Sequence, residues 1–88
     1  PTEYSLSTNY PNPFNPSTSI EFALPQTDHV TLAIYNMVGQ QVATLIDGRI
    51  EAGYHNIVWE AADMPTGVYF YSLQTGGKTI VRKMTLVK

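Results

Sequence analysis

The 88-residue sequence contains no cysteine and only five basic residues. Without cysteine, the chain forms no disulfide and offers no thiolate ligand to a metal ion. Because exported domains without disulfides are common, this absence leaves the compartment open. The net charge of −2 argues against general nucleic-acid binding, since proteins that follow a phosphate backbone carry a basic surface. We therefore expect no nucleic-acid partner.

Long apolar runs are also absent. The longest lie around Ile57–Trp59 and Val68–Tyr71, far below the roughly 20 residues of a membrane-spanning helix. Hydrophobic residues still make up 43% of the chain and charged residues 14%, a composition too apolar for a disordered tail. The length allows one hydrophobic core, so we expect one domain over residues 1–88. Because the sequence starts at Pro1 and shows no signal peptide, we expect an excerpt of a larger exported protein.

Apolar and polar residues alternate between turn signals, and helical periodicity is nearly absent. Such alternation is typical of antiparallel strands with one buried face. It predicts strands at 20–24, 30–34, 40–46, 55–59, 68–75 and 78–87, and an extra edge strand at 4–8. Without helices to cover a sheet, these strands pack most economically as two sheets face to face. The predicted fold is all-β, an immunoglobulin-like antiparallel β-sandwich of about seven strands.

Turn residues separate the predicted strands. Residues 36–39 predict a turn, and Val42 and Leu45, three apart, indicate that the following strand ends early or contains a bulge. The next break is marked by Asp47, Gly48 and Gly53. Residues 76–77 are both glycine and fit a two-residue hairpin turn, which requires the final strand to pair antiparallel with the strand before it.

The titratable residues do not form a recognisable catalytic arrangement. Asp28 and His29 are adjacent on a strand, so their side chains point to opposite faces and cannot act together as base and orienting group. His55 shares a face with Ile57 and Trp59, which favours a hydrogen-bonded core histidine. No spacing fits a metal site, and no glycine pattern fits a phosphate site. We predict no catalytic residue, no metal and no cofactor.

The aromatic residues allow two interpretations. Five of them could form a sugar-stacking platform, namely Tyr54, Trp59, Tyr69, Phe70 and Tyr71. Core packing is favoured, because Trp59 is in register with Ile57 and Tyr69 resembles a tyrosine corner at the start of a strand. Both faces of Val68–Tyr71 are apolar, so one face is either covered through Phe14 or exposed as a patch.

Residues 9–16, Asn-Tyr-Pro-Asn-Pro-Phe-Asn-Pro, form a proline-rich segment that we call the proline strap. Three prolines within six residues exclude a helix and a central strand. We expect an ordered loop whose Phe14 packs on the sandwich, since a stiff segment loses little entropy on docking. Asn9, Asn12 and Asn15 are interpreted as structural, because asparagine amides make turn hydrogen bonds that prolines cannot.

Basic residues are concentrated near the end of the chain. Residues 1–77 hold all seven acidic residues and one basic residue, a net charge of −6, whereas the last eleven residues carry +4. This asymmetry favours a positive recognition surface. The alternative is that basic side chains only protect an edge strand from aggregation. The four residues concerned are Lys78, Arg82, Lys83 and Lys88.

Several motifs carry a resemblance to a known family: Asn9–Thr18, Ile34–Gln40, Ala52–His55 with Trp59, Gly67–Tyr71 and Lys83–Lys88. From about residue 6 to residue 88, the chain resembles the type A C-terminal sorting domain of the type IX (Por) secretion system. It is more weakly similar to the immunoglobulin-like domain of the flagellar hook-capping protein. Thr66 and Thr85 stand where family members often have alanine or an apolar residue.

The resemblance implies a non-catalytic domain at the end of a multidomain cargo, secreted or displayed on the surface of a Gram-negative bacterium after passage through the periplasm. The implied partners are a translocon, a processing protease or transpeptidase, and the upstream domains of the same chain. We predict that recognition involves the terminal strand, in which Met84 and Leu86 are buried to hold register: Lys83, Met84, Leu86 and Lys88.

A second set of residues is predicted to form the structural motif: Asn9, Pro11, Pro13, Phe14, Asn15, Pro16, Gly39, Trp59, Gly67 and Tyr69. Two alternatives to sorting remain, a carbohydrate-binding accessory module of a secreted glycoside hydrolase and a structural spacer. Polysaccharide binding would favour the first. A lower melting temperature of the parent after deletion, with unchanged export, would favour the second.

Overall fold

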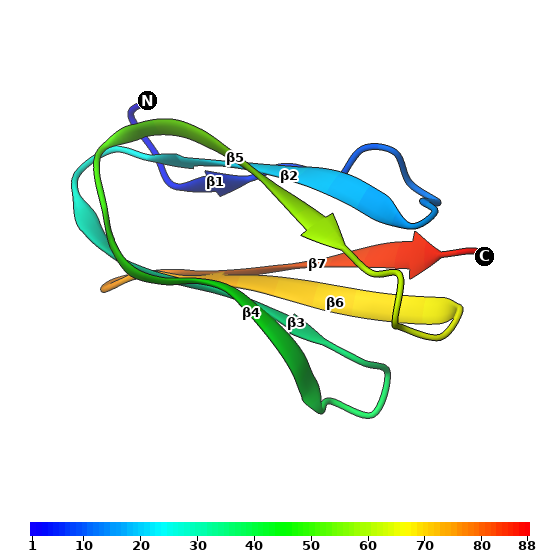
Figure 1. Ribbon diagram of the computed structural model, residues 1–88. Helices are drawn as coiled ribbons and strands as arrows, with labels where there is room; N and C mark the ends of the chain where they lie inside the picture. The colour runs from blue at the N-terminus through cyan, green and yellow to red at the C-terminus, as the bar shows by residue number, and fades with distance from the viewer.

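The computed structural model describes all residues, 1–88, and consists of seven antiparallel strands (Figure 1). It contains no helix long and apolar enough to cross a membrane. The three-stranded sheet has the order β1-β2-β5 and the four-stranded sheet the order β4-β3-β6-β7. The bounds are β1 Ser5–Leu6, β2 Ser17–Leu24, β3 Asp28–Tyr35, β4 Gln41–Ile50, β5 Gly53–Glu60, β6 Gly67–Gln74 and β7 Thr79–Leu86.

The two sheets lie face to face with the core between them (Figure 1). In β2 and β3, alternate apolar side chains point inward and are almost fully buried, as the pleat of a strand requires. The chain passes between sheets after β2, β4 and β5, a connectivity typical of immunoglobulin-like sandwiches. The predicted all-β sandwich is confirmed. The inward residues of these two strands are Ile20, Phe22, Leu24, Val30, Leu32 and Ile34.

β4 contains two irregularities, so of the two alternatives for this strand the bulge is correct and the early end is wrong. Leu32 pairs with Ile46 but Ala33 pairs with Thr44, so Leu45 is an extra residue. Val42 is extra in the same way, because the pairing shifts again between Ile34 and Tyr35. Bulges twist an edge strand and discourage pairing with another chain. The spacing of Val42 and Leu45 in the sequence follows from these two insertions.

The predicted break at Asp47 and Gly48 is wrong. Both residues continue β4, where they pair with Thr31 and Val30 of β3. Pairing with the whole length of β3 outweighs the low strand propensity of aspartate and glycine. The chain turns only at residues 51–52, before Gly53 with a φ of +132°.

The two other turns are as predicted. At residues 36–39, the side-chain oxygen Oδ1 of Asn36 accepts hydrogen bonds from the amides of Val38 at 3.1 Å and Gln40 at 2.9 Å. Gly39 has a φ of +84°, a conformation that favours glycine. At residues 76–77, the amide of Thr75 donates to the carbonyl of Lys78 at 2.8 Å and closes the hairpin between β6 and β7.

An aromatic cluster fills one end of the core. Trp59 lies with its ring centroid 5.8 Å from that of Phe14 and 5.5 Å from that of Tyr69. The Tyr69 hydroxyl donates to the carbonyl of Pro65 at 2.6 Å, which is the geometry of a tyrosine corner. The predicted core positions of Phe14, Trp59 and Tyr69 are confirmed, with exposed fractions of 2%, 5% and 4%.

Replacing Trp59 by alanine should lower the free energy of unfolding by about 3 to 5 kcal/mol, because it leaves a large cavity beside Phe14 and Tyr69. Urea denaturation followed by circular dichroism measures this change. The matched control is Val58→Ala, the adjacent residue with a 58% exposed side chain, which should cost less than about 0.5 kcal/mol. Equal costs for both variants would refute the core assignment.

Alkaline pH should destabilise the fold through Tyr71, which is fully buried and donates its hydroxyl to the carbonyl of Ser7 at 2.6 Å. Burial raises the pKa of Tyr71 above its ordinary value of 10.0. The folded state thus favours the neutral phenol, and this stabilisation is present below pH 10.0 and is lost as pH rises through the raised pKa. The melting temperature should fall in that range, and less steeply in Tyr71→Phe. Identical pH slopes for both proteins would contradict the assignment.

Candidate functional site

The terminal strand β7 lies at the edge of the four-stranded sheet and pairs with β6 along its whole length, from Gly67 opposite Leu86 to Gln74 opposite Thr79. Met84 and Leu86 point into the core and are fully buried, as predicted. Lys83 points to the outer face and is exposed. The strand is therefore fixed by its inner side chains and shows its outer ones to solvent.

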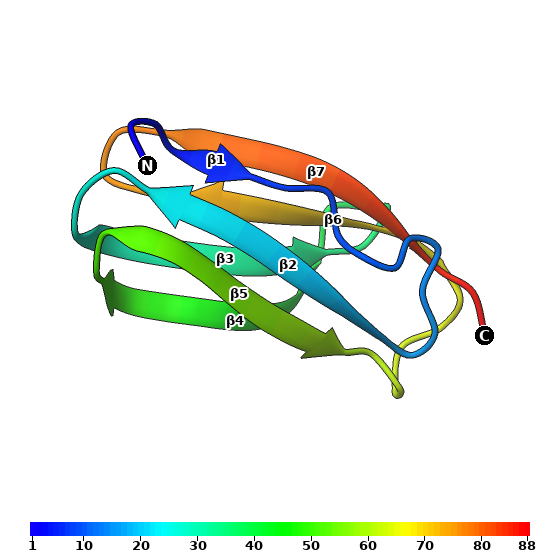
Figure 2. The ribbon, with the colours of Figure 1, turned by 90° about the horizontal axis from the view of Figure 1, so that it is seen from above.

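The proline strap covers the free edge of β7 at its C-terminal end (Figure 2). The amide of Phe14 donates to the carbonyl of Thr85 at 3.0 Å, and its carbonyl accepts from the amide of Val87 at 3.0 Å. The amide of Thr85 donates to Oδ1 of Asn12 at 3.1 Å. The strap therefore forms one isolated parallel bridge to the end of β7 and satisfies the edge groups of Thr85 and Val87.

The strap is also tied to the three-stranded sheet. The side chain of Asn9, 4% exposed, donates to the carbonyl of Pro11 at 3.1 Å and to Oγ1 of Thr18 at 3.0 Å. The carbonyl of Pro16 accepts from the amide of Ala61 at 2.9 Å. Asn9 and Asn12 thus have the expected structural role. Asn15 is exposed and its side chain makes no hydrogen bond, so the expectation fails for this residue.

The N-terminal segment bridges the rest of the gap between the two sheets. Nε of Arg82 on β7 donates to the carbonyl of Leu6 on β1. The hydroxyl of Tyr71 on β6 donates to the carbonyl of Ser7, which lies between β1 and the strap. Figure 2 shows β1 running beside β7. The open side of the sandwich is thus closed by residues from both ends of the chain.

The four basic residues near the end of the chain do not form one patch. Arg82 and Lys83 are adjacent on β7, so their side chains point to opposite faces. Lys78 lies in the β6–β7 hairpin, a strand length away. Nζ of Lys88 donates to the carbonyl of Ala62 at 2.6 Å. A single positive surface therefore does not assemble, and Lys83 is the basic side chain that the outer face of β7 presents.

The side chains of Asp28 and His29 have different partners. The Asp28 carboxylate accepts hydrogen bonds from the Tyr4 hydroxyl at 2.8 Å and the Gly76 amide at 3.3 Å, and so links the N-terminal segment to the β6–β7 hairpin. The bond from Tyr4 lowers the pKa of Asp28 below its usual value. The imidazole of His29 lies instead 3.3 Å from the carboxylate of Asp47.

His55 lies at the margin of the core rather than within it. Its imidazole is half-buried and stacks on Phe22 with ring centroids 5.2 Å apart. Nε2 lies 2.7 Å from the carbonyl of Glu51. The predicted face is correct and the imidazole is hydrogen-bonded, but its burial is incomplete because it lies near the start of β5. Nowhere in the structure do three or more histidine, aspartate or glutamate side chains gather as metal ligands would.

The five aromatic residues considered as a sugar platform point in different directions. Trp59, Tyr69 and Tyr71 are buried, Phe70 is half-buried on the outer face of β6, and Tyr54 is exposed. Phe14 is buried and its ring lies against that of Trp59, with centroids 5.8 Å apart. The outer face borders a shallow, largely apolar hollow of about 390 Å³, whose hydrophobic lining residues are Tyr35, Met37, Phe70 and Val81.

Most of the chain matches a protein-family model. The model described as "Secretion system C-terminal sorting domain" matches residues 8–87, which include the strap, the aromatic cluster and β7. No curated protein matches the chain. Domains of this family are non-catalytic sorting signals for type IX (Por) secretion, and they imply a secreted or cell-surface protein of Bacteroidetes.

Asn12→Ala should lower the free energy of unfolding by about 1 kcal/mol, because the Thr85 amide loses its acceptor at the edge of β7. Native-state hydrogen exchange should show faster exchange at the Thr85 amide. The matched control is Asn15→Ala, in the same strap but without a side-chain hydrogen bond, which should change neither value. Unaltered exchange at Thr85 in Asn12→Ala would show that the strap does not hold the terminal strand.

Proposed function

Because this chain belongs to the secretion system C-terminal sorting domain family, we propose that β7 and the proline strap are recognised together as its sorting signal. The observation that carries this proposal is the strap's three hydrogen bonds to the edge of β7, two through Phe14 and one through Asn12. They hold the terminal strand in one position relative to the body of the domain. A partner then meets a rigid surface and not a flexible tail.

In this proposal the signal exists only in the folded domain. Asn12 and Thr85 are 73 residues apart, so their hydrogen bond forms only after the intervening strands have assembled. Leu86 and Met84 are buried in the shared core and cannot be in place before it forms. A translocon that reads this surface would therefore accept a domain that has completed folding.

The accessible side chains of the signal lie on the outer face of β7. Lys83 is the charged group of this face, and Lys88 follows at the end of the strand. We assign to Lys83 an ion pair with an acidic group of a translocon component, since complementary charge gives specificity and speeds association. Met84 and Leu86 act indirectly, by fixing the register in which Lys83 is presented.

The 88 residues form one domain attached to an upstream cargo, which passes through the periplasm of a Gram-negative bacterium before crossing the outer membrane. A processing protease or transpeptidase then separates or anchors the cargo. The compact domain, with a radius of gyration of 12.6 Å, supports a module that is recognised and processed independently of its cargo.

Lys83→Glu should reduce export of a fused cargo about tenfold or more, because reversing a charge at a complementary contact costs over about 1.4 kcal/mol. The measurement is the ratio of extracellular to periplasmic cargo. The matched control is Lys78→Glu, an exposed lysine on the hairpin at the other end of β7, which should export normally. Both variants should keep the melting temperature of the parent domain.

A deletion of residues 83–88 tests the signal as a whole and should abolish export. Because it also removes the buried Met84 and Leu86, proteolysis must first show whether the rest of the domain stays folded. Normal export of the deleted protein would overturn the role of β7. Normal export of Lys83→Glu, with export lost on deletion, would place recognition elsewhere on the strand than at Lys83.

A further inference from the structure

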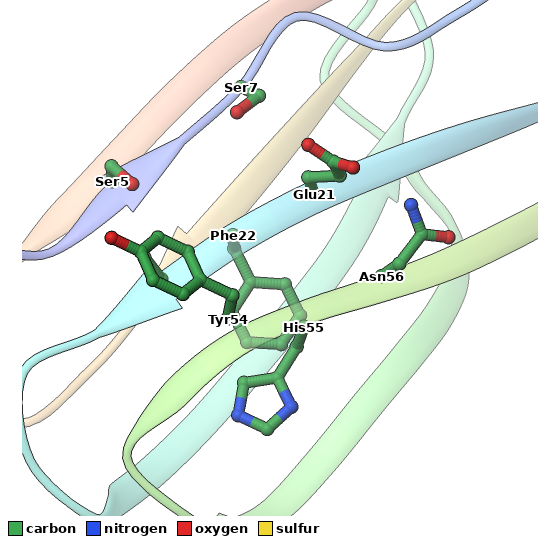
Figure 3. Close-up of a pocket in the computed structure, with 8 residues that line it drawn as sticks. Ser5, Ser7, Glu21, Phe22, Tyr54, His55 and Asn56 are labelled. Carbon is green, nitrogen blue, oxygen red and sulfur yellow. The ribbon is translucent and has the colours of Figure 1, made fainter. Parts of the chain in front are cut away.

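We infer that the outer face of the three-stranded sheet carries a binding site for a neutral saccharide, centred on Tyr54. A hollow of about 410 Å³ opens there on the solvent side of β1, β2 and β5. Figure 3 shows the Tyr54 ring on one side of it, Glu21 and Asn56 on the other, and Ser5 and Ser7 along its rim. This volume lies within the range of small-molecule sites.

The register of the strands explains the hollow. Ser5, Ala23 and Tyr54 form one row across β1, β2 and β5. Glu21 and Asn56 are paired in the next row, where the Ser7 amide donates to the Glu21 carbonyl at 2.9 Å. Ala23 has the smallest side chain of the first row and is 2% exposed, so it lies below the level of its neighbours. The hollow is thus built mainly from outward-facing residues of β1, β2 and β5, with Ser7, Phe22 and His55 completing its lining.

The chemistry of the lining favours a sugar. An aromatic face packs against the C–H face of a pyranose ring, and Tyr54 is 79% exposed and free to do so. The Glu21 carboxylate accepts hydrogen bonds from hydroxyl groups, and the Asn56 amide and the two serine hydroxyls donate and accept them. Glu21 supplies the only carboxylate of the hollow and no lysine or arginine lines it, so an anionic ligand is disfavoured.

Exposure alone does not make Tyr54 a binding residue, because single exposed aromatic residues are common. Tyr10 is an exposed tyrosine that has no such surroundings. It is 80% exposed, but it lines none of the hollows on the surface. Tyr54 has almost the same exposure but lines a hollow together with the polar side chains of Ser5, Ser7, Glu21, His55 and Asn56. Tyr54 therefore belongs to a hollow with polar neighbours, whereas Tyr10 is an isolated exposed ring.

The saccharide site is independent of the sorting signal. It shares no residue with the proline strap or β7, and it lies on the sheet that does not contain β7. A sorting domain with this site could hold its cargo near a glycan after export. Loss of saccharide binding should leave export unchanged, so failure of one assignment does not affect the other.

The test is an NMR titration of the ¹⁵N-labelled 88-residue chain with four neutral tetrasaccharides: cellotetraose, xylotetraose, mannotetraose and maltotetraose. At least one should shift the amide signals of Glu21, Tyr54 and Asn56 with a Kd in the range of about 0.01 to 1 mM. Tyr54→Ala should weaken this binding at least about tenfold, the equivalent of about 1.4 kcal/mol. Tyr10→Ala, the matched control, should bind as the parent chain does.

Glu21→Gln distinguishes a saccharide from a cation. The glutamine keeps a hydrogen-bonding oxygen, so saccharide binding should fall by less than about tenfold. If the ring and carboxylate instead bind an alkylammonium group, N-acetyl-lysine methyl ester will shift the same amides and Glu21→Gln will abolish the effect. That result would overturn the inference. It would also be overturned if all four tetrasaccharides left these amides unshifted, or if Tyr54→Ala and Tyr10→Ala bound equally.

Discussion

The free edge of β7 is the constraint on which the rest of this structure depends. An edge strand exposes unpaired amides and carbonyls that invite pairing with another chain. A proline-rich segment is poorly suited to satisfy them, because proline has no amide hydrogen. Phe14, placed between Pro13 and Pro16, supplies both a donor and an acceptor, and the side chain of Asn12 supplies a second acceptor. Between the prolines, Asn12 and Phe14 thus supply the hydrogen-bonding groups that the end of the chain uses at this edge.

Phe14 couples this edge to the core. Its backbone binds β7 in the four-stranded sheet, whereas its ring lies against Trp59 of β5 in the three-stranded sheet. One residue therefore stabilises both the terminal strand and the contact between sheets. The contacts that close the sandwich join positions more than 70 residues apart, such as Asn12 with Thr85 and Leu6 with Arg82. Because such contacts form only once the chain entropy of the intervening loop has been lost, the position of β7 reports on the fold of the whole domain.

The features that could be predicted from the sequence are those that depend on the local pattern of apolar and polar residues. Alternation in β2 and β3 identified their buried faces, and the spacing of Val42 and Leu45 indicated the bulges of β4. The interpretation failed where tertiary pairing outweighed local preference, as at Asp47 and Gly48 within β4. The separation of Arg82 from Lys83 could have been predicted from the sequence. Arg82 is two residues from Met84 and four from Leu86, so it lies on the same inner face of β7, away from Lys83. The attachment of the strap to Thr85 and Val87 had no local signal, because it depends on how the finished sheets bring residues 12–14 beside the end of the chain.

The outer faces of the two sheets differ in chemical composition. One suits a protein partner and the other a small polar ligand. On the four-stranded sheet, Lys83 lies two residues from Val81 on the same face of β7, and Val81 borders an apolar hollow with Met37 and Phe70. A basic group beside an apolar surface suits a protein partner, since burial of the neighbouring side chains removes water and strengthens an ion pair. The outer face of the three-stranded sheet instead presents one aromatic ring among hydroxyl, amide and carboxylate groups, which suits a small polar ligand. Because the pleat of the strands fixes these faces on opposite sides of a common core, a partner at β7 and a ligand at Tyr54 can be bound at the same time.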